Sequence, residues 1–152
     1  MKITFLVGDA TQPIGDGHKF ICHISNDLGL WRRGFVLALS QKWNAPEMFY
    51  RNNRDYELGN VQYIRVENDI TVVNMIAQHG IGYDEFNSPP IRYWALESCL
   101  YDVNKYAQQY NITATIHMPR IGCGLAGGDW AKVEEILHKV LTVDVFVYDL
   151  KK

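Results

Sequence analysis

The chain has 152 residues, of which 47% are hydrophobic, and this is enough apolar side chain for the core of one domain. Its formal net charge of −2 and its pI of about 6.2 argue against bulk affinity for long nucleic acid, although a small anion held by main-chain donors remains open. No repeat, linker or low-complexity tract divides the sequence, so we expect one domain over residues 1–152.

Three cysteines, Cys22, Cys99 and Cys123, lack the spacing of a disulfide framework or a metal site, and we interpret all of them as thiols. We therefore predict no metal and no cofactor. The first residues, MKITFLVGD, form too short an apolar run for a signal peptide, and no later run is long enough to span a membrane. We expect a cytoplasmic, monomeric protein without a membrane partner.

Apolar periodicity predicts strands that alternate with helices along the chain. Strands are expected over residues 2–7 and 19–24, followed by helices over 34–43 and 46–54. Two further strands, 61–66 and 70–76, resemble a hairpin because a short polar segment separates them. A loop over 78–90 leads into the longest helix, 91–110, and then come a strand over 112–118, a helix over 130–141 and a last strand over 143–148. This order predicts the α/β class, with a central mixed sheet between helices.

Polar residues and glycines follow four of the predicted strands, and ligand sites in α/β sheets lie at the carboxyl ends of strands. These clusters are Gly8 and Asp9, then 25–27, then Gln78 and His79, and finally the glycines of 122–128. We expect several of them to meet in one crevice. Their convergence favours a nucleotide-like ligand.

The stretch ITATIHMPRIGCGLAGGDW, residues 112–130, has the most specific local pattern in the chain. A strand should end at Pro119, four glycines follow, and a helix begins near Asp129, which most simply caps it. Glycines this dense let main-chain N–H groups approach an anion, and the positive end of the helix dipole would add to the same place. We therefore expect a phosphate or pyrophosphate site in this loop.

Two other interpretations of the loop stay open. The glycines match GxGxxG between a strand and a helix, and Asp149 follows at about the spacing of a dinucleotide fingerprint. The chain ends at Lys152, however, so the second unit of a dinucleotide fold would have no residues. Alternatively the glycines serve only a tight turn, although four exceed what one turn requires.

The other candidate ligand contacts each have a structural alternative. Asp9 would accept a hydrogen bond from an adenine amino group or cap its own loop. Asn26 and Asp27 would bind ribose hydroxyls or form a turn. Cys123 would be an activated nucleophile near a helix N-terminus or a small packing residue, and the sequence places no base beside it.

The roles of the ionisable side chains elsewhere in the chain also have structural alternatives. His79 and Asp84 lie in the long loop, where they would do acid–base work or remain exposed. His23 and His117 lie within apolar strands and are expected to be core histidines, because no further metal ligands accompany them. The pair Arg32-Arg33 would contact phosphate or form a solvated pair.

Four strings of the sequence carry a resemblance to a known family. They are VGDAT (7–11), CHISNDLGLWRRGFVLALS (22–40), MPRIGCGLAGG (118–128) and VYDL (147–150), and they stand in matching order and spacing. With them the chain resembles the macro domain, an ADP-ribose-binding module, over essentially its whole length. It looks most like the branch containing terminal ADP-ribose protein glycohydrolase and the yeast ADP-ribose-1″-phosphate phosphatase. The resemblance implies a three-layer α-β-α fold with a six-stranded mixed sheet and ADP-ribose across the strand ends.

The resemblance also implies a role for each matching position. Asp9 would hold the adenine amino group, the Ala10 N–H would reach the ring, and Tyr148 or Leu150 would pack near it. The loop from Gly122 to Ala126 would wrap the pyrophosphate. The implied ligand-binding residues, including those around the distal ribose, are Asp9, Ala10, Ser25, Asn26, Gly34, Phe35, Gln78, Gly122, Cys123, Gly124, Leu125, Ala126, Tyr148 and Leu150.

The chain departs from the family at positions that the resemblance would make catalytic. The glycohydrolase has a lysine after its fourth strand and an aspartate after GCGL, where this chain has Gln78 and Ala126. A larger hydrolytic branch has an acidic residue near the distal ribose, where this chain has Val36. The lysine–aspartate mechanism is therefore not expected, and His79 and Asp84 are the predicted catalytic residues if the protein is an enzyme.

Two functions follow as expectations. The first is hydrolysis of an ADP-ribosyl derivative, either ADP-ribosylated protein or nucleic acid or O-acyl-ADP-ribose. The second is a non-catalytic reader whose partner is ADP-ribose or an ADP-ribosylated macromolecule. The missing catalytic residues favour the reader, whereas the lack of another module to recruit favours the enzyme.

Overall fold

The computed structural model describes residues 1–151, which form an α/β fold with six strands and four helices. In chain order the elements are β1 (Ile3–Val7), β2 (Lys19–Asn26), α1 (Phe35–Lys42), α2 (Ala45–Asn53), β3 (Val61–Glu67), β4 (Ile70–Gln78), α3 (Tyr93–Tyr110), β5 (Thr115–Met118), α4 (Trp130–Val140) and β6 (Val145–Asp149). The predicted alternation of strands and helices is confirmed. None of the helices in these 151 residues is long and apolar enough to cross a membrane.

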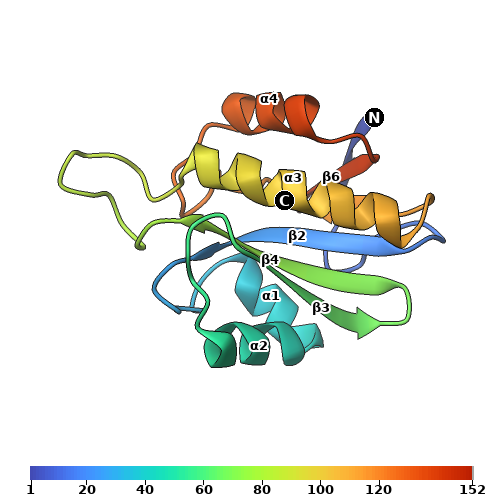
Figure 1. Cartoon of the computed structure of the whole chain (residues 1–152), viewed down its shortest axis with the longest axis horizontal. Coiled ribbons are helices and arrows are strands. Elements are labelled where there is room, and N and C mark those ends of the chain that lie inside the picture. Colours follow the sequence, from blue (N-terminus) through green and yellow to red (C-terminus); the bar gives the residue numbers. More distant parts are fainter. Residues whose placement is uncertain (152) are drawn as a thin grey trace.

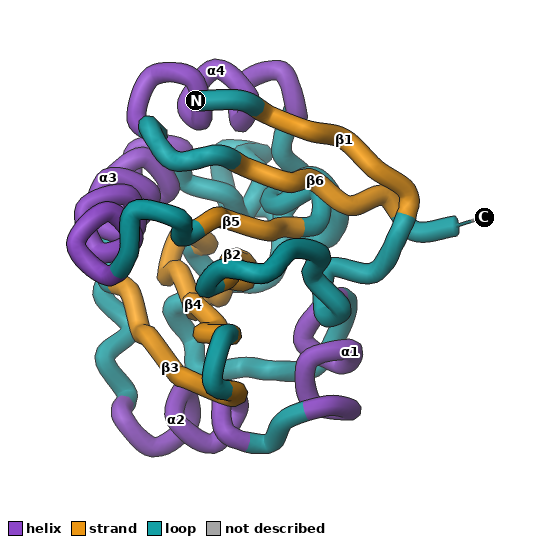
Figure 2. Tube along the Cα trace, turned by 90° about the vertical axis from the view of Figure 1, so that its right-hand side faces the viewer, coloured by secondary structure: helices purple, strands orange, loops and turns teal. Residues whose placement is uncertain are grey.

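The strands form one mixed sheet in the order β1-β6-β5-β2-β4-β3 (Figure 2). β3 pairs antiparallel with β4, as expected of a hairpin, and all other neighbours are parallel. β1, β6, β5, β2 and β4 therefore present their carboxyl ends at the same edge of the sheet. That edge is where a ligand site is expected in an α/β protein.

Helices cover both faces of the sheet, α3 and α4 on one and α1 and α2 on the other (Figure 1). Because both faces are covered, β2 is buried along nearly its whole length, and its side chains alternate between two cores. Phe20 and Cys22 belong to the core under α3 and α4, whereas Ile21 joins Leu39 and Tyr50 in the core under α1 and α2. This three-layer arrangement confirms the predicted fold class.

The largest difference from the predicted elements is at the start of β5. The strand was expected from residue 112, but Asn111 instead closes a turn, accepting hydrogen bonds on its Oδ1 from the Thr113 N–H and hydroxyl at 2.9 and 3.0 Å. Its carbonyl also accepts from the Ala114 N–H. Ile112 is consequently 96% exposed and lies outside the strand, so the predicted start of the strand at residue 112 is wrong. The Asn111 side chain hydrogen-bonds to the nearby backbone, which gives this segment an alternative to strand pairing, as asparagine side chains often do.

Candidate ligand-binding site

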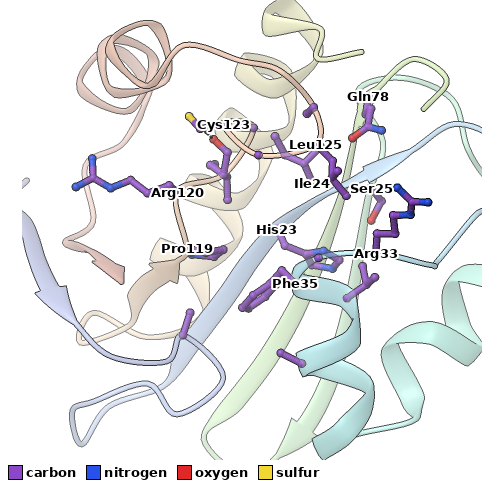
Figure 3. Close-up of a pocket in the computed structure, with 18 of the residues that line it drawn as sticks. His23, Ile24, Ser25, Arg33, Phe35, Gln78, Pro119, Arg120, Cys123 and Leu125 are labelled. Carbon is purple, nitrogen blue, oxygen red and sulfur yellow. Dashed lines mark hydrogen bonds between the residues drawn. The ribbon is translucent and has the colours of Figure 1, made fainter. Parts of the chain in front are cut away.

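A cavity of about 930 Å³ opens at the carboxyl-end edge of the sheet, which is room for a nucleotide-sized ligand (Figure 3). Segments that follow β1, β2, β5 and β6 meet there with Gln78 at the end of β4. The start of α1 completes the wall. All the ligand-binding residues that the resemblance implies, from Asp9 to Leu150, line this cavity, whereas the further candidate Asp27 does not.

Three of the four glycines in the loop after β5 are required by the fold. Gly122 and Gly127 have φ values of 75° and 71°, and a Cβ on Gly122 would lie 2.5 Å from Cδ1 of Ile91. A Cβ on Gly128 would lie 2.4 Å from the carbonyl oxygen of Gly122. Gly124 is different, because a Cβ there would meet no atom within 4 Å. A tight turn therefore explains three glycines and leaves Gly124 without a packing reason.

The same loop, which lines the cavity, has unused main-chain donors. The N–H groups of Gly124, Leu125 and Ala126 take part in no hydrogen bond within residues 1–151. Successive free N–H groups in a turn form a concave anion site. Asp129 caps α4 as predicted, accepting from the Ala131 N–H at 2.9 Å. Residues of α4 do not line the cavity, so the loop itself supplies the donors.

Asp9 lies at one end of the cavity and takes one of its two predicted roles, that of a loop cap. Its Oδ1 accepts from the Thr11 N–H and hydroxyl, both at 2.8 Å, so this oxygen caps the loop. Its Oδ2 accepts no hydrogen bond from the part of the chain that the structure describes. The neighbouring Ala10 N–H is likewise unused among the described residues. An acceptor and a donor thus lie side by side at this end.

A buried hydrogen-bond chain fixes Tyr148 beside Asp9. The Ile14 N–H donates to the Tyr148 hydroxyl at 3.0 Å, and that hydroxyl lies 2.7 Å from Nδ1 of His117. His117 Nε2 lies 2.7 Å from the Thr115 hydroxyl. His117 is a satisfied core histidine, as predicted, and it holds the tyrosine ring against the cavity.

Arg120 is a cavity residue to which the sequence assigned no role. Its guanidinium forms two hydrogen bonds of 2.9 Å with the Asp149 carboxylate, and these raise the pKa of Arg120. The cation also lies 4.8 Å from the ring centroid of Phe5 and 4.9 Å from that of Trp130. This pairing removes the dinucleotide interpretation of Asp149, since both of its carboxylate oxygens bind a protein cation. A charged residue inside the MPRIGCG string was the available signal.

Asn26 lines the other end of the cavity, but its side chain serves the fold. Its Oδ1 accepts from the N–H groups of Leu28 and Leu30, at 2.9 and 3.1 Å. The one proton of the Tyr50 hydroxyl is shared between this Oδ1, at 2.9 Å, and the main-chain carbonyl of Asn26, at 2.6 Å. Its Nδ2 donates to the Leu30 carbonyl at 2.7 Å. The predicted turn role of this side chain is therefore confirmed, and its oxygen has no capacity left for a ribose hydroxyl.

The predicted acid–base pair of His79 and Asp84 is not assembled. His79 Nδ1 lies 2.7 Å from the Asp27 carboxylate, whereas Asp84 pairs with Arg92 at 3.0 Å. The Ser88 N–H and the arginine lower the pKa of Asp84, which makes it a weaker base. Neither predicted residue lines the cavity. His79 instead ties the start of the loop over 78–90 to Asp27, and Asp84 ties the middle of the loop to Arg92. The predicted acid–base pair at the cavity is therefore corrected.

Reactive groups are scarce at the end of the cavity near α1. Figure 3 shows Ser25, Arg33 and Gln78 gathered there, with Arg120 at the opposite end. The carboxylates that line the cavity, Asp9 and Asp149, both lie at the Arg120 end. Cys123 also lines the wall, but burial raises the pKa of its thiol, which favours the packing alternative.

Two buried histidines give the protein a predictable acid sensitivity. Burial lowers the pKa of His23 to about 4 and that of His117 to about 3, whereas both would titrate near 6.5 in the unfolded chain. Below pH 6.5 the unfolded state therefore binds more protons than the folded state, and the free energy of unfolding decreases as the pH is lowered. We expect the free energy of unfolding in urea to decrease by a few kcal/mol from pH 7 to about pH 4. An unfolding free energy that is constant over this range would contradict the buried neutral state.

The chain is similar to several known proteins. No protein-family model matches it. A macrodomain protein from Streptomyces coelicolor is 42% identical with a TM-score of 0.83, over 97% of this chain and 99% of that one. A protein from Bacteroides thetaiotaomicron is 49% identical with a TM-score of 0.94, over 98% of each chain. DarTG from Thermosipho africanus, solved in complex with ADP-ribose, shares the fold at 15% identity with a TM-score of 0.68, over 87% of this chain and 38% of that one.

The sequence is also similar to part of a much longer protein. Chromodomain-helicase-DNA-binding protein 1-like from Danio rerio is 30% identical over 151 residues, which is 91% of this chain. The match spans only 14% of that protein's length. The similarity therefore concerns one module and not the activity of the whole protein.

Proposed function

This chain belongs to the macro-domain family, and on that basis we propose that it binds ADP-ribose in the cavity at the strand ends. The observation that carries the proposal is the run of three unused N–H groups at Gly124, Leu125 and Ala126, in the wall of the cavity. Donors in that place suit a pyrophosphate. The ADP-ribose complex of DarTG, which has the same fold, supports this ligand.

The orientation of the ligand follows from the groups at the two ends. We propose that the adenine amino group donates to Asp9 Oδ2 and that the Ala10 N–H donates to the ring, with Tyr148 and Leu150 packed beside it. The distal ribose then lies by Ser25, Gly34 and the start of α1. Acceptor and donor at the adenine end match the edge of adenine, which offers one of each.

Hydrolysis of an ADP-ribosyl bond is a second candidate activity at the same site. It would need a water positioned by the ligand's own phosphate, because the carboxylates of the cavity wall lie at the adenine end. Val36, Gln78 and Ala126 line the wall where hydrolytic relatives would carry an acid or a lysine. This composition favours the reader over the hydrolase.

Calorimetry with ADP-ribose, ADP and AMP tests the binding proposal. We expect ADP-ribose to bind more tightly than AMP, since only the former engages the loop over 122–126 and the distal end. Equal affinity for the two would contradict the proposed orientation. Incubation with ADP-ribosylated protein, ADP-ribosylated DNA and O-acetyl-ADP-ribose separates the activities, because release of ADP-ribose from any of them would establish the hydrolase and no release would leave the reader.

A further inference from the structure

The loop between β4 and α3, residues 79–90, forms a rim at the end of the cavity near α1. Its first residue, His79, lies 2.7 Å from the carboxylate of Asp27, which follows β2. On its other side the loop reaches the glycine-rich loop, where a Cβ on Gly127 would lie 3.1 Å from the hydroxyl oxygen of Tyr83. The loop thus lies between the segments that follow β2 and β5, and it stands out from the body of the molecule (Figure 1).

Two aromatic side chains of this loop are held in solvent by a well-fixed turn. Tyr83 and Phe86 are 63% and 80% exposed. Between them, Asp84 Oδ1 accepts from the N–H groups of Phe86 and Ser88, both at 2.9 Å. The other oxygen of Asp84 pairs with Arg92 at 3.0 Å. The turn is therefore ordered before any partner arrives, so that contact with these rings would cost little conformational entropy.

Two arginines complete the rim on the side of the segment after β2. Arg32 and Arg33 are exposed and line the cavity wall, and Figure 3 shows Arg33 at the same end as Gln78. Neither arginine forms a hydrogen bond or an ion pair within residues 1–151. The nearby carboxylate of Asp27 pairs instead with His79. The sequence left open whether the arginines contact phosphate or are only solvated, and the fold gives them no internal role.

The charges of the rim balance, so that it does not attract a polyanion from a distance. Its three arginines, at positions 32, 33 and 92, are matched by carboxylates at positions 27, 84 and 85. Long-range attraction of nucleic acid depends on an excess of positive charge, which is absent here. The free arginines therefore act at short range, on a partner that is already held at the cavity.

The place of the rim says which part of a bound molecule meets it. In the proposed orientation the distal ribose lies near α1, so a group attached to that ribose leaves the cavity beside the rim. Every nucleotide of a single strand carries a phosphate and an unstacked base, so any strand offers anions to the arginines and flat rings to the aromatic side chains. A peptide offers both only where its own sequence happens to place them.

We infer that the rim recognises the acceptor to which ADP-ribose is attached, and that this acceptor is a single-stranded nucleic acid. Arg32 and Arg33 contact its phosphates, and Tyr83 and Phe86 stack on bases beside the modified nucleotide. The inference rests on the proposed binding of ADP-ribose and adds the partner that carries it. Anchoring of ADP-ribose in the cavity raises the concentration of the strand at the rim, which replaces the missing long-range attraction.

Binding of four ligands at low salt tests the choice of partner. They are free ADP-ribose, an unmodified strand of about ten nucleotides, the same strand joined at a central base to the distal ribose of ADP-ribose by a non-hydrolysable linker, and an acidic peptide of similar length joined in the same way. We expect the modified strand to bind at least about ten-fold more tightly than free ADP-ribose or the modified peptide. The unmodified strand should bind about a hundred-fold more weakly than the modified one.

Two variants test the residues of the rim. Phe86→Ser should weaken binding of the modified strand about five-fold to ten-fold, because one stacking contact is lost, and should change the affinity for free ADP-ribose by less than about two-fold. The double variant Arg32→Gln/Arg33→Gln should reduce the slope of log affinity against log salt concentration by about 1.4, or about 0.7 for each phosphate contact. A purely structural role of the arginines would leave this slope unchanged.

Matched controls change the same chemistry elsewhere on the surface. Ile112→Ser removes an apolar side chain that is 96% exposed before β5, at the opposite edge of the sheet. Lys105→Gln/Lys139→Gln removes two charges from α3 and α4, outside the cavity wall. Both controls should leave the four affinities unchanged, and thermal unfolding checks that every variant is folded.

Three results would overturn the inference while ADP-ribose binding still stands. They are a modified strand that binds no more tightly than free ADP-ribose, a modified peptide that binds more tightly than the strand, and undiminished affinity of folded Phe86→Ser for the strand. Failure of the wild-type protein to bind free ADP-ribose would overturn the proposed function and this inference with it.

Discussion

Replacing Gly124 with valine should abolish ADP-ribose binding while the protein remains folded. The Cβ would meet no protein atom within 4 Å, so the fold tolerates a side chain there, but that space is where we place the pyrophosphate. We expect affinity to fall by at least about a hundred-fold in calorimetry, because a steric block in this loop removes contacts on both sides of it. Circular dichroism and the thermal midpoint should match those of the wild-type protein.

Gly122→Ala is the matched control, and we expect it to lower the stability of the fold, which Gly124→Val should leave unchanged. Gly122 has a φ of 75°, and an added Cβ would lie 2.5 Å from Ile91, so this change strains the turn itself. We expect a loss of stability of about 1–3 kcal/mol in urea unfolding. Undiminished ADP-ribose affinity in Gly124→Val, or unfolding of that variant, would show that the loop has been assigned wrongly.

Replacing Asp9 with asparagine should reverse the preference of the site for the base. The asparagine Oδ1 preserves the two hydrogen bonds from Thr11, so the loop stays capped. Its Nδ2, however, replaces the acceptor Oδ2 with a donor that faces the adenine amino group. We expect ADP-ribose affinity to fall about 10-fold to 100-fold, because a charge-assisted hydrogen bond is lost and two donors are opposed.

The hypoxanthine analogue of ADP-ribose supplies the complementary measurement. Its ring carries a carbonyl oxygen in place of the amino group, so it should bind Asp9→Asn more tightly than the wild-type protein. Calorimetry with both ligands on both proteins gives a complete cycle. An unchanged ratio of the two affinities would mean that Asp9 does not contact the base and acts only as a loop cap.

The fold was predictable because its local signals agree with its tertiary structure. Strands rich in β-branched residues alternate with helices, and parallel strands bring every loop that follows them to one edge. That rule alone predicted that Asp9, Ser25 and the glycine loop would lie at one cavity. Asn111 shows its limit, since a single side chain hydrogen-bonded to Thr113 shortened a strand that β-propensity favoured.

Side-chain partners were harder to predict than positions. Asn26 lies at the end of β2, where the alternation of the strand stops, and its bonds to Leu30 and Tyr50 depend on a loop and a helix that pattern reading does not place. His79 and Asp84 are five residues apart in one loop, yet they do not pair with each other. His79 pairs with Asp27, and Asp84 pairs with Arg92. Such pairings are tertiary, and sequence proximity does not reveal them.

His23 illustrates a prediction that was correct about burial and incomplete about chemistry. An apolar strand identifies a core histidine, but only the contact of its Nε2 with the Asn74 side chain shows which ring nitrogen lacks a partner among the described residues. A sequence signal did exist, because Asn74 is a polar residue within the apolar run ITVVNMIA and must have partners of its own. Buried polar residues in neighbouring strands are therefore the positions to examine first.

The central claim is that the N–H groups of Gly124, Leu125 and Ala126 hold the pyrophosphate of ADP-ribose. Titration of ¹⁵N-labelled protein with ADP-ribose, followed by ¹H–¹⁵N correlation spectra, tests it directly. We expect the amide resonances of these three residues to move downfield more than any others in the chain, as hydrogen bonds to phosphate form. Saturation with ADP-ribose that leaves all three resonances in place would contradict the assignment of this loop.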